Sequence, residues 1–66
     1  MTIKINDREY ELPEGTTLLQ AMEKAQVKPK GIATAVNNVV VPSQMRAKKV
    51  LTDGDTVVII TAFYGG

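Results

Sequence analysis

Residues 56–63 read Thr56-Val57-Val58-Ile59-Ile60-Thr61-Ala62-Phe63, a run made up of β-branched and aromatic residues except for Ala62, which is typical of a β-strand. Four consecutive positions within this run are apolar, so both faces of the strand carry apolar side chains. Successive residues of a strand point to opposite faces. We therefore expect one set to face the core, Val57 and Ile59, and the other to face outward, Val58, Ile60 and Phe63.

The sequence ends directly after this run with Tyr64, Gly65 and Gly66. Glycine has no Cβ, so two glycines can reach unusual backbone angles and fit a channel little wider than the chain itself. We expect residues 1–63 to form one domain and residues 64–66 a flexible tail whose terminal carboxylate is the reactive group. A frayed end, or a chain cut after a Gly-Gly linker, would give the same ending.

The composition excludes several classes of function. The 66 residues contain no Cys and no His, which rules out thiol nucleophiles, thiolate or imidazole metal ligands, imidazole bases and disulfides. Eight basic and seven acidic residues give a net charge of +1, so we expect no nucleic-acid partner. No apolar run approaches the length of a membrane span, and the first residues do not resemble a signal peptide, so we expect a cytoplasmic protein.

The basic residues cluster only as two pairs of lysines. Four lysines make up this clustering: Lys28, Lys30, Lys48 and Lys49. We interpret them as part of a solvated face, with a docking patch for an acidic partner as the alternative. The pair Asp53 and Asp55 flanks Gly54, but two carboxylates fall short of a calcium loop, so we predict a turn and no metal site.

The first half of the sequence predicts a hairpin followed by a helix. Ile3 and Ile5 alternate with polar residues, residues 6–8 have turn chemistry, and Tyr10 and Leu12 alternate again. Thr17 with Gln20 matches a capping box, although Thr16 could equally be the N-cap. Apolar residues then recur at helical spacing, and we expect Pro29 and Gly31 to close the helical region.

The second half predicts three further strands. Residues 32–36 and 39–41 are β-type and are separated by Asn37-Asn38, which favours a tight hairpin with positive φ angles. Pro42 ends that strand or places it at an edge, and a short helical turn is possible between residues 43 and 49. The predicted order is strand-strand-helix-strand-strand-strand, with the helix linking strands that pair in parallel. Because one helix covers only one face of a sheet, the outward apolar set of the last strand predicts a docking surface.

Segments spread over the whole chain resemble the β-grasp, or ubiquitin-like, fold, and within it the ThiS family of sulfur carriers of thiamine biosynthesis. The resembling segments are residues 3–7, 15–18, 35–42, 51–55 and the terminal diglycine. The resemblance implies an α+β fold in which one main helix packs on one face of a mixed sheet of four to five strands. Tyr64 departs from the small or aliphatic residue that often precedes the diglycine.

The resemblance also implies a mechanism in which the chain is a co-substrate and not an enzyme. A ThiF-type adenylating enzyme would use ATP and Mg²⁺ to convert the Gly66 carboxylate into an acyl-adenylate. Sulfur from a donor such as a cysteine desulfurase would then displace AMP and leave a Gly66 thiocarboxylate, which delivers sulfur to a ThiG-type thiazole synthase. Gly65 would give the tail reach, Val58, Ile60, Phe63 and Tyr64 would form the partner interface, and the chain itself would bind no cofactor.

Other functions remain open on the same sequence. A sulfur carrier of molybdopterin synthase shares the terminal chemistry, and a ubiquitin-type modifier of lysines shares the fold. A β-grasp interaction module with an inert tail would use only its surface. A small enzyme in its own right would need an acid–base pair in a pocket, and the sequence offers none.

Overall fold

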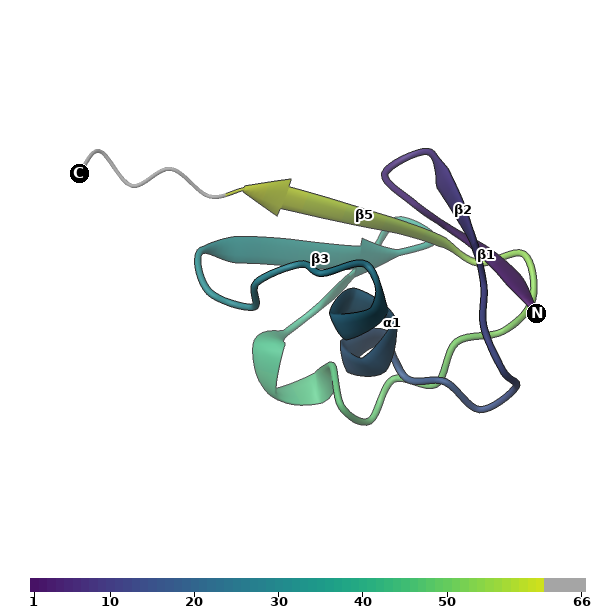
Figure 1. The fold of residues 1–66 in the computed structure, drawn as a ribbon. Coiled ribbons are helices and arrows are strands. Elements are labelled where there is room, and N and C mark those ends of the chain that lie inside the picture. Colours follow the sequence, from purple (N-terminus) through teal and green to yellow (C-terminus); the bar gives the residue numbers. More distant parts are fainter. Residues whose placement is uncertain (62–66) are drawn as a thin grey trace.

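The computed structural model describes residues 1–61, which form five strands, one α-helix and one short 3-10 helix (Figure 1). The first hairpin consists of β1 (Thr2–Ile5) and β2 (Arg8–Glu11). It is closed by Asn6 and Asp7, whose φ angles are 48° and 69°. Both angles are positive, as a two-residue type I′ turn requires. The hairpin is therefore confirmed, but Arg8, which we expected in the turn, is already the first residue of β2.

The helix α1 (Leu18–Lys24) begins as predicted and ends earlier than predicted. Thr17 is the N-cap, because its hydroxyl accepts from the Gln20 N–H while the Gln20 side chain accepts from the Thr17 N–H. The other candidate, Thr16, donates its hydroxyl to the Pro13 carbonyl instead, at 2.7 Å. The helix ends at Lys24, well before Pro29, because Gln26 adopts a φ of 61° that cannot continue it.

The second hairpin consists of β3 (Ile32–Val36) and β4 (Val39–Val41). It turns at Asn37 and Asn38, with φ angles of 51° and 69°, so the predicted positive-φ turn is confirmed. Pro42 ends β4, and the 3-10 helix η1 (Ser43–Met45) follows as the predicted helical turn. The chain then turns again, with Gly54 at a φ of 86°, and enters β5 (Thr56–Thr61).

The five strands form one mixed sheet in the order β2-β1-β5-β3-β4. The last strand therefore lies in the centre, parallel to β1 and antiparallel to β3. A parallel pair needs a crossover connection, and α1 lies within that connection. Figure 1 shows α1 packed against one face of the sheet. The mixed five-stranded sheet with one helix confirms the predicted α+β, β-grasp architecture.

The core lies between α1 and the face of the sheet that it covers. Its ten buried apolar residues come from every strand except β2, from α1, and from the loops after β2 and η1: Ile3, Ile5, Leu12, Leu18, Ala21, Met22, Val36, Val41, Leu51 and Val57. Val57, the second residue of β5 (Thr56–Thr61), is fully buried, so the central strand is anchored to the core near its start. Within residues 1–61 no helix is long and apolar enough to cross a membrane.

Candidate functional site

The central strand β5 presents its second set of apolar side chains on the face that α1 leaves uncovered. Val58 and Ile60 are 36% and 58% exposed, whereas Val57 is buried and Ile59 is half-buried. The predicted inward and outward sets are therefore confirmed for these four residues. This strand leads directly into residues 62–66, so the exposed residues lie next to the segment that carries the predicted reaction.

Neighbouring strands extend this apolar surface to the edge of the sheet. Residues that lie opposite each other in an antiparallel pair share a face. Ala33 lies opposite Ile60, while Ala35 lies opposite both Val58 and Val40. We call these five residues the outer apolar face: Ala33, Ala35, Val40, Val58 and Ile60. Contiguous exposed apolar surface of this kind marks interaction sites more often than it occurs by chance.

The other half of the uncovered sheet face is polar. Lys4 on β1 lies between Glu9 on β2 and Thr56 on β5, and all three residues are exposed. The apolar surface is thus limited to the side formed by β5, β3 and β4. A partner that docks on it would approach along the last part of β5.

The turn before β5 is held together by a buried carboxylate. Asp55 is 7% exposed and accepts from the Thr52 N–H at 2.8 Å, the Thr52 hydroxyl at 3.0 Å and the Asn37 amide at 2.9 Å. Burial raises the pKa of Asp55, but these hydrogen bonds and the charge of Lys49 outweigh it and hold the pKa below its ordinary value. The carboxylate therefore has a structural role in fixing the start of β5.

Asp53 also serves the turn. Its carboxylate accepts from the Thr2 N–H at 2.7 Å, which ties the turn to the start of β1. Residues 1–61 contain no group of three or more metal-ligating side chains. The predicted turn at residues 52–55 is confirmed, and both of its aspartates are engaged by groups of the chain itself.

A buried arginine fixes the connection that precedes β3. Arg46 is 4% exposed, and its guanidinium donates to the Thr34 hydroxyl at 3.1 Å, the Pro29 carbonyl at 3.2 Å and the Ile32 carbonyl at 3.1 Å. All three acceptors are uncharged. Arg46 therefore fastens η1 to the loop that ends α1 and to the beginning of β3.

An open groove of about 440 Å³ runs beside the edge strand β4. Its apolar wall includes Val39, Val41 and Met45, and its titratable lining groups are Lys48 and Lys49. Two lysines without a facing carboxylate do not form a general acid–base pair. The groove can hold an apolar group, but its lining offers no means of proton transfer.

Four predicted site residues, Phe63, Tyr64, Gly65 and Gly66, lie outside the described residues, so their roles stay predictions. Sequence reasoning missed two kinds of residue that position the site. The amide side chains of Asn6 and Asn37 bond to the backbone of β5, although the sequence marked them only as turn residues. Arg46 gave no signal, because a lone arginine in a mixed segment is usually exposed.

Comparisons with known proteins agree over the whole chain. The sequence profile of the ThiS family matches residues 2–66. The sulfur carrier protein ThiS of Escherichia coli K12 is 29% identical over 66 residues, which is the full length of both chains. A crystal structure of the thiamine biosynthesis protein ThiS from Geobacter metallireducens superimposes with a TM-score of 0.83 at 19% identity, covering 100% of this chain and 99% of that one. A solution structure of a thiamine biosynthesis protein from the same organism gives 0.75 at 17% identity, covering 100% of this chain and 88% of that one.

Proposed function

This chain belongs to the ThiS family, and we propose that it carries sulfur on the carboxyl group of Gly66 for the thiazole step of thiamine biosynthesis. The observation that carries the proposal is that the family match runs through Gly65 and Gly66. The carrier is consumed and regenerated as a co-substrate, and its partners supply the catalytic groups.

The chemistry begins with a carboxylate, which is a poor electrophile because attack would have to expel oxide. A ThiF-type adenylating enzyme transfers AMP from ATP to the Gly66 carboxylate with Mg²⁺ on the phosphates, and pyrophosphate leaves. A sulfur nucleophile at the oxidation level of hydrosulfide then attacks the carbonyl carbon, and AMP leaves with the electron pair of the broken C–O bond. The product is a Gly66 thiocarboxylate, which a ThiG-type thiazole synthase accepts.

Support for this proposal comes from the exposed apolar residues that β5 carries shortly before its last described residue. Ile60 on the outer apolar face is six residues from Gly66, and six residues span at most about 20 Å. A partner that contacts Ile60 therefore has its reaction centre within roughly that distance. The outer apolar face supplies binding area, while the diglycine supplies a segment slim enough for a narrow site.

The proposal is tested by the intact mass of the protein after incubation with ATP, Mg²⁺, sulfide and the cognate adenylating enzyme. We expect a gain equal to one oxygen replaced by sulfur, mapped to Gly66 by fragmentation. A variant with one alanine added after Gly66 keeps the described fold and displaces the carboxylate, so it should show no gain. The proposal fails if the wild-type chain gains no mass while the same enzyme preparation converts another diglycine carrier.

Recipient choice is tested separately with the purified thiocarboxylate form. Addition of thiazole synthase and its small-molecule substrates should return Gly66 to the carboxylate and produce the thiazole. Retention of the sulfur with thiazole synthase, and release to molybdopterin synthase instead, would assign the carrier to that other pathway.

A further inference from the structure

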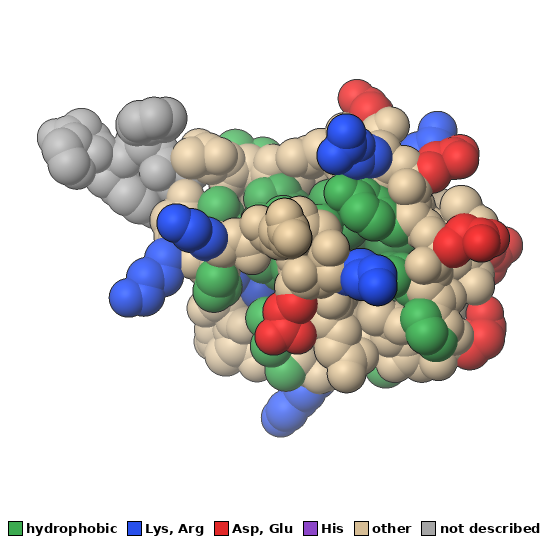
Figure 2. Space-filling model, viewed as in Figure 1, with side chains coloured by type: hydrophobic (Ala, Val, Ile, Leu, Met, Phe, Trp, Pro, Cys, Tyr) green, Lys and Arg blue, Asp and Glu red, His purple; other side chains and the backbone are tan. Residues whose placement is uncertain are grey.

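The small net charge conceals a strong separation of charge along the chain. The stretch from Lys24 to Thr52 contains six of the eight basic residues and no Asp or Glu: Lys24, Lys28, Lys30, Arg46, Lys48 and Lys49. All seven acidic residues lie outside it. This basic stretch includes β3, β4 and η1, which lie on one side of β5, whereas Asp7, Glu9 and Glu11 lie on the β1–β2 hairpin on the other side. In Figure 2 most acidic side chains in view lie at the end opposite to the one where β5 finishes.

Two of these lysines lie in the loop that leads to the residue opposite the end of β5. Ile32, the first residue of β3, lies opposite Thr61, the last described residue of β5. Lys28 and Lys30 belong to the loop that leads into Ile32, and both are exposed. The loop therefore carries two positive charges to the end of the sheet from which the tail continues. Lys and Arg side chains gather at this end in Figure 2.

The loop is held in place by the buried arginine. Arg46 donates to the carbonyl of Pro29, which lies between the two lysines, and to the carbonyl of Ile32, two residues after Lys30. The backbone is thus held on both sides of Lys30, and Lys28 directly precedes the first of these contacts, so the loop that presents the two lysines keeps a defined position relative to β5. A defined position is what distinguishes a recognition element from mobile surface lysines.

We propose that Lys28 and Lys30 form a basic contact that docks on an acidic rim around the tail-binding site of the adenylating enzyme. This inference rests on the proposed function and names the chemistry of the partner surface. The outer apolar face provides area, and the two lysines in the loop before β3 set the direction of approach. Charges at the rim of an interface act mainly on the association rate, and their effect falls as salt screens them.

The partner is a protein surface and not a nucleic acid. Phosphate-driven binding needs several neutralised phosphates to reach useful affinity, whereas this contact consists of two lysines beside an apolar sheet face. Ile60 and Ala33 on that face lie opposite each other near the same end of the sheet. A partner surface that has acidic residues beside an apolar area would complement both the two lysines and the outer apolar face.

The test measures kcat/KM for carrier-dependent exchange of pyrophosphate into ATP by the cognate adenylating enzyme. The double charge reversal Lys28→Glu with Lys30→Glu should lower kcat/KM by about tenfold or more at about 0.1 M salt, with kcat at saturation unchanged. The loss should shrink to less than about threefold at about 1 M salt, where the Debye length is only about 3 Å. The double variant Lys28→Arg with Lys30→Arg keeps the charge and should remain close to wild type.

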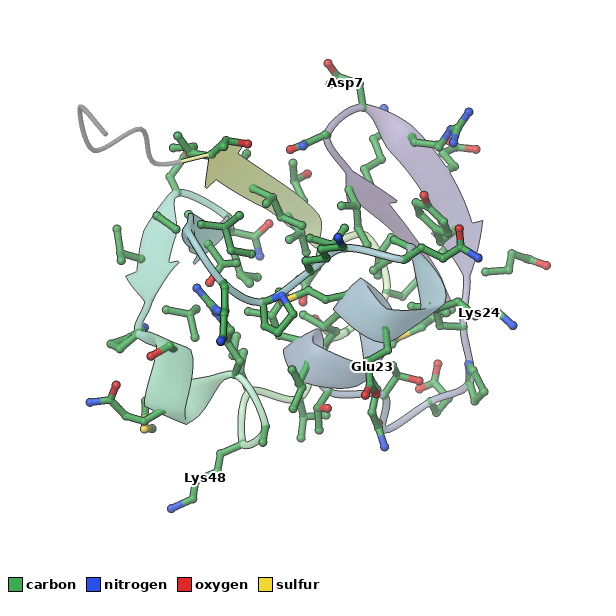
Figure 3. All side chains as sticks on the ribbon, turned by 60° about the vertical axis from the view of Figure 1, so that its left-hand side comes forward. Asp7, Glu23, Lys24 and Lys48 are labelled. Atoms are coloured by element: carbon green, nitrogen blue, oxygen red, sulfur yellow. The ribbon has the colours of Figure 1, made fainter. Side chains whose placement is uncertain are left out.

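The matched control is Lys24→Glu with Lys48→Glu, which changes the net charge equally. Both side chains extend away from the end of β5 (Figure 3), so this variant should change kcat/KM by less than about threefold. Equal losses in the two double reversals would mean that only total charge matters and would overturn the proposal. So would an undiminished kcat/KM for the Lys28 and Lys30 reversal. A wild-type chain that supports no exchange at all would instead refute the proposed function, and the docking inference with it.

Discussion

The side-chain amide of Asn6 spans the backbone of Ile59, accepting from its N–H at 2.8 Å and donating to its carbonyl oxygen at 3.2 Å. The parallel ladder between β1 and β5 pairs only two residues of each strand, ending at Ile5 and Val57. The side-chain amide of Asn6 therefore takes the place of the next backbone hydrogen bonds between β1 and β5. On the other edge of β5, the Asn37 side chain accepts from the Thr56 N–H at 2.9 Å. The turns of both hairpins thus hold the strand that carries the outer apolar face.

Replacing Asn6 with Gly should measure what the side-chain hydrogen bonds to Ile59 contribute to stability, because Gly tolerates the φ of 48° and lacks the amide. We expect the free energy of unfolding to fall by about 1–2 kcal/mol, as for the loss of two exposed hydrogen bonds. Urea unfolding followed by circular dichroism measures it. Asn38→Gly is the control: Asn38 has a φ of 69° and makes no side-chain hydrogen bond to the described residues. An equal loss of unfolding free energy in both variants would assign the effect to a glycine in the turn and not to the hydrogen bonds between Asn6 and Ile59.

Asp55 should make the stability of the fold depend on acidity. Its hydrogen bonds hold the pKa in the folded state below the unfolded value. The network therefore stabilises the fold fully above the unfolded pKa, and this stabilisation is lost as the pH falls through the folded pKa. Asp55→Asn should lower the free energy of unfolding at neutral pH by about 1–3 kcal/mol and flatten its decline in acid.

A second variant tests the cause of that pH dependence. Thr52→Val removes the hydroxyl that donates to Asp55 at 3.0 Å and changes the shape of the side chain little. The folded-state pKa of Asp55 should rise toward its unfolded value, so the acid decline should be smaller and should end at a higher pH than in the wild type, while its onset stays at the unfolded pKa. Urea midpoints measured across the acid range give both profiles. If Asp55→Asn reproduces the wild-type acid decline, the carboxylate is not its source.

Arg46 should be among the most sensitive positions of the fold. Arg46→Lys keeps the charge but cannot reach three acceptors at once, which leaves the partly buried carbonyl groups of Pro29 and Ile32 without their donors. We expect a loss of about 2–4 kcal/mol in the free energy of unfolding. Lys48→Met removes one exposed charge from the same region and should stay within about 0.5 kcal/mol of wild type. A small effect of Arg46→Lys would show that an ammonium group suffices at this position.

The sequence predicted the elements of this fold better than their connections. The alternation of Val57 and Val58 assigned the two faces of β5 correctly, because burial follows a strict period of two in a strand. The turns at Asn6 and Asn37 followed from their tolerance of positive φ. Their bonds to β5 did not, since they depend on which strands become neighbours. The early end of α1 was missed because Gln26 is not a residue that favours a left-handed conformation.

Ile60 offers the sharpest test of the outer apolar face. Ile60→Glu places a charge where we expect an apolar partner surface, and an unpaired buried charge opposes association strongly. Because Ile60 is 58% exposed in the free protein, the variant should melt close to the wild-type temperature. The KM of the adenylating enzyme for the carrier should rise by about tenfold or more.

The control for this prediction is a residue of similar exposure on the other face of the sheet. Val39 is 67% exposed and lies opposite Val36, which faces the core, so Val39 is not part of the outer apolar face. Val39→Glu should leave the KM within about twofold of wild type, since a charge outside the docking surface stays hydrated. A rise in KM shared by both variants would indicate a general effect of negative charge on the β3–β4 side of the molecule. A rise confined to Ile60→Glu would locate the docking surface on the uncovered face of β5, within reach of the terminal diglycine.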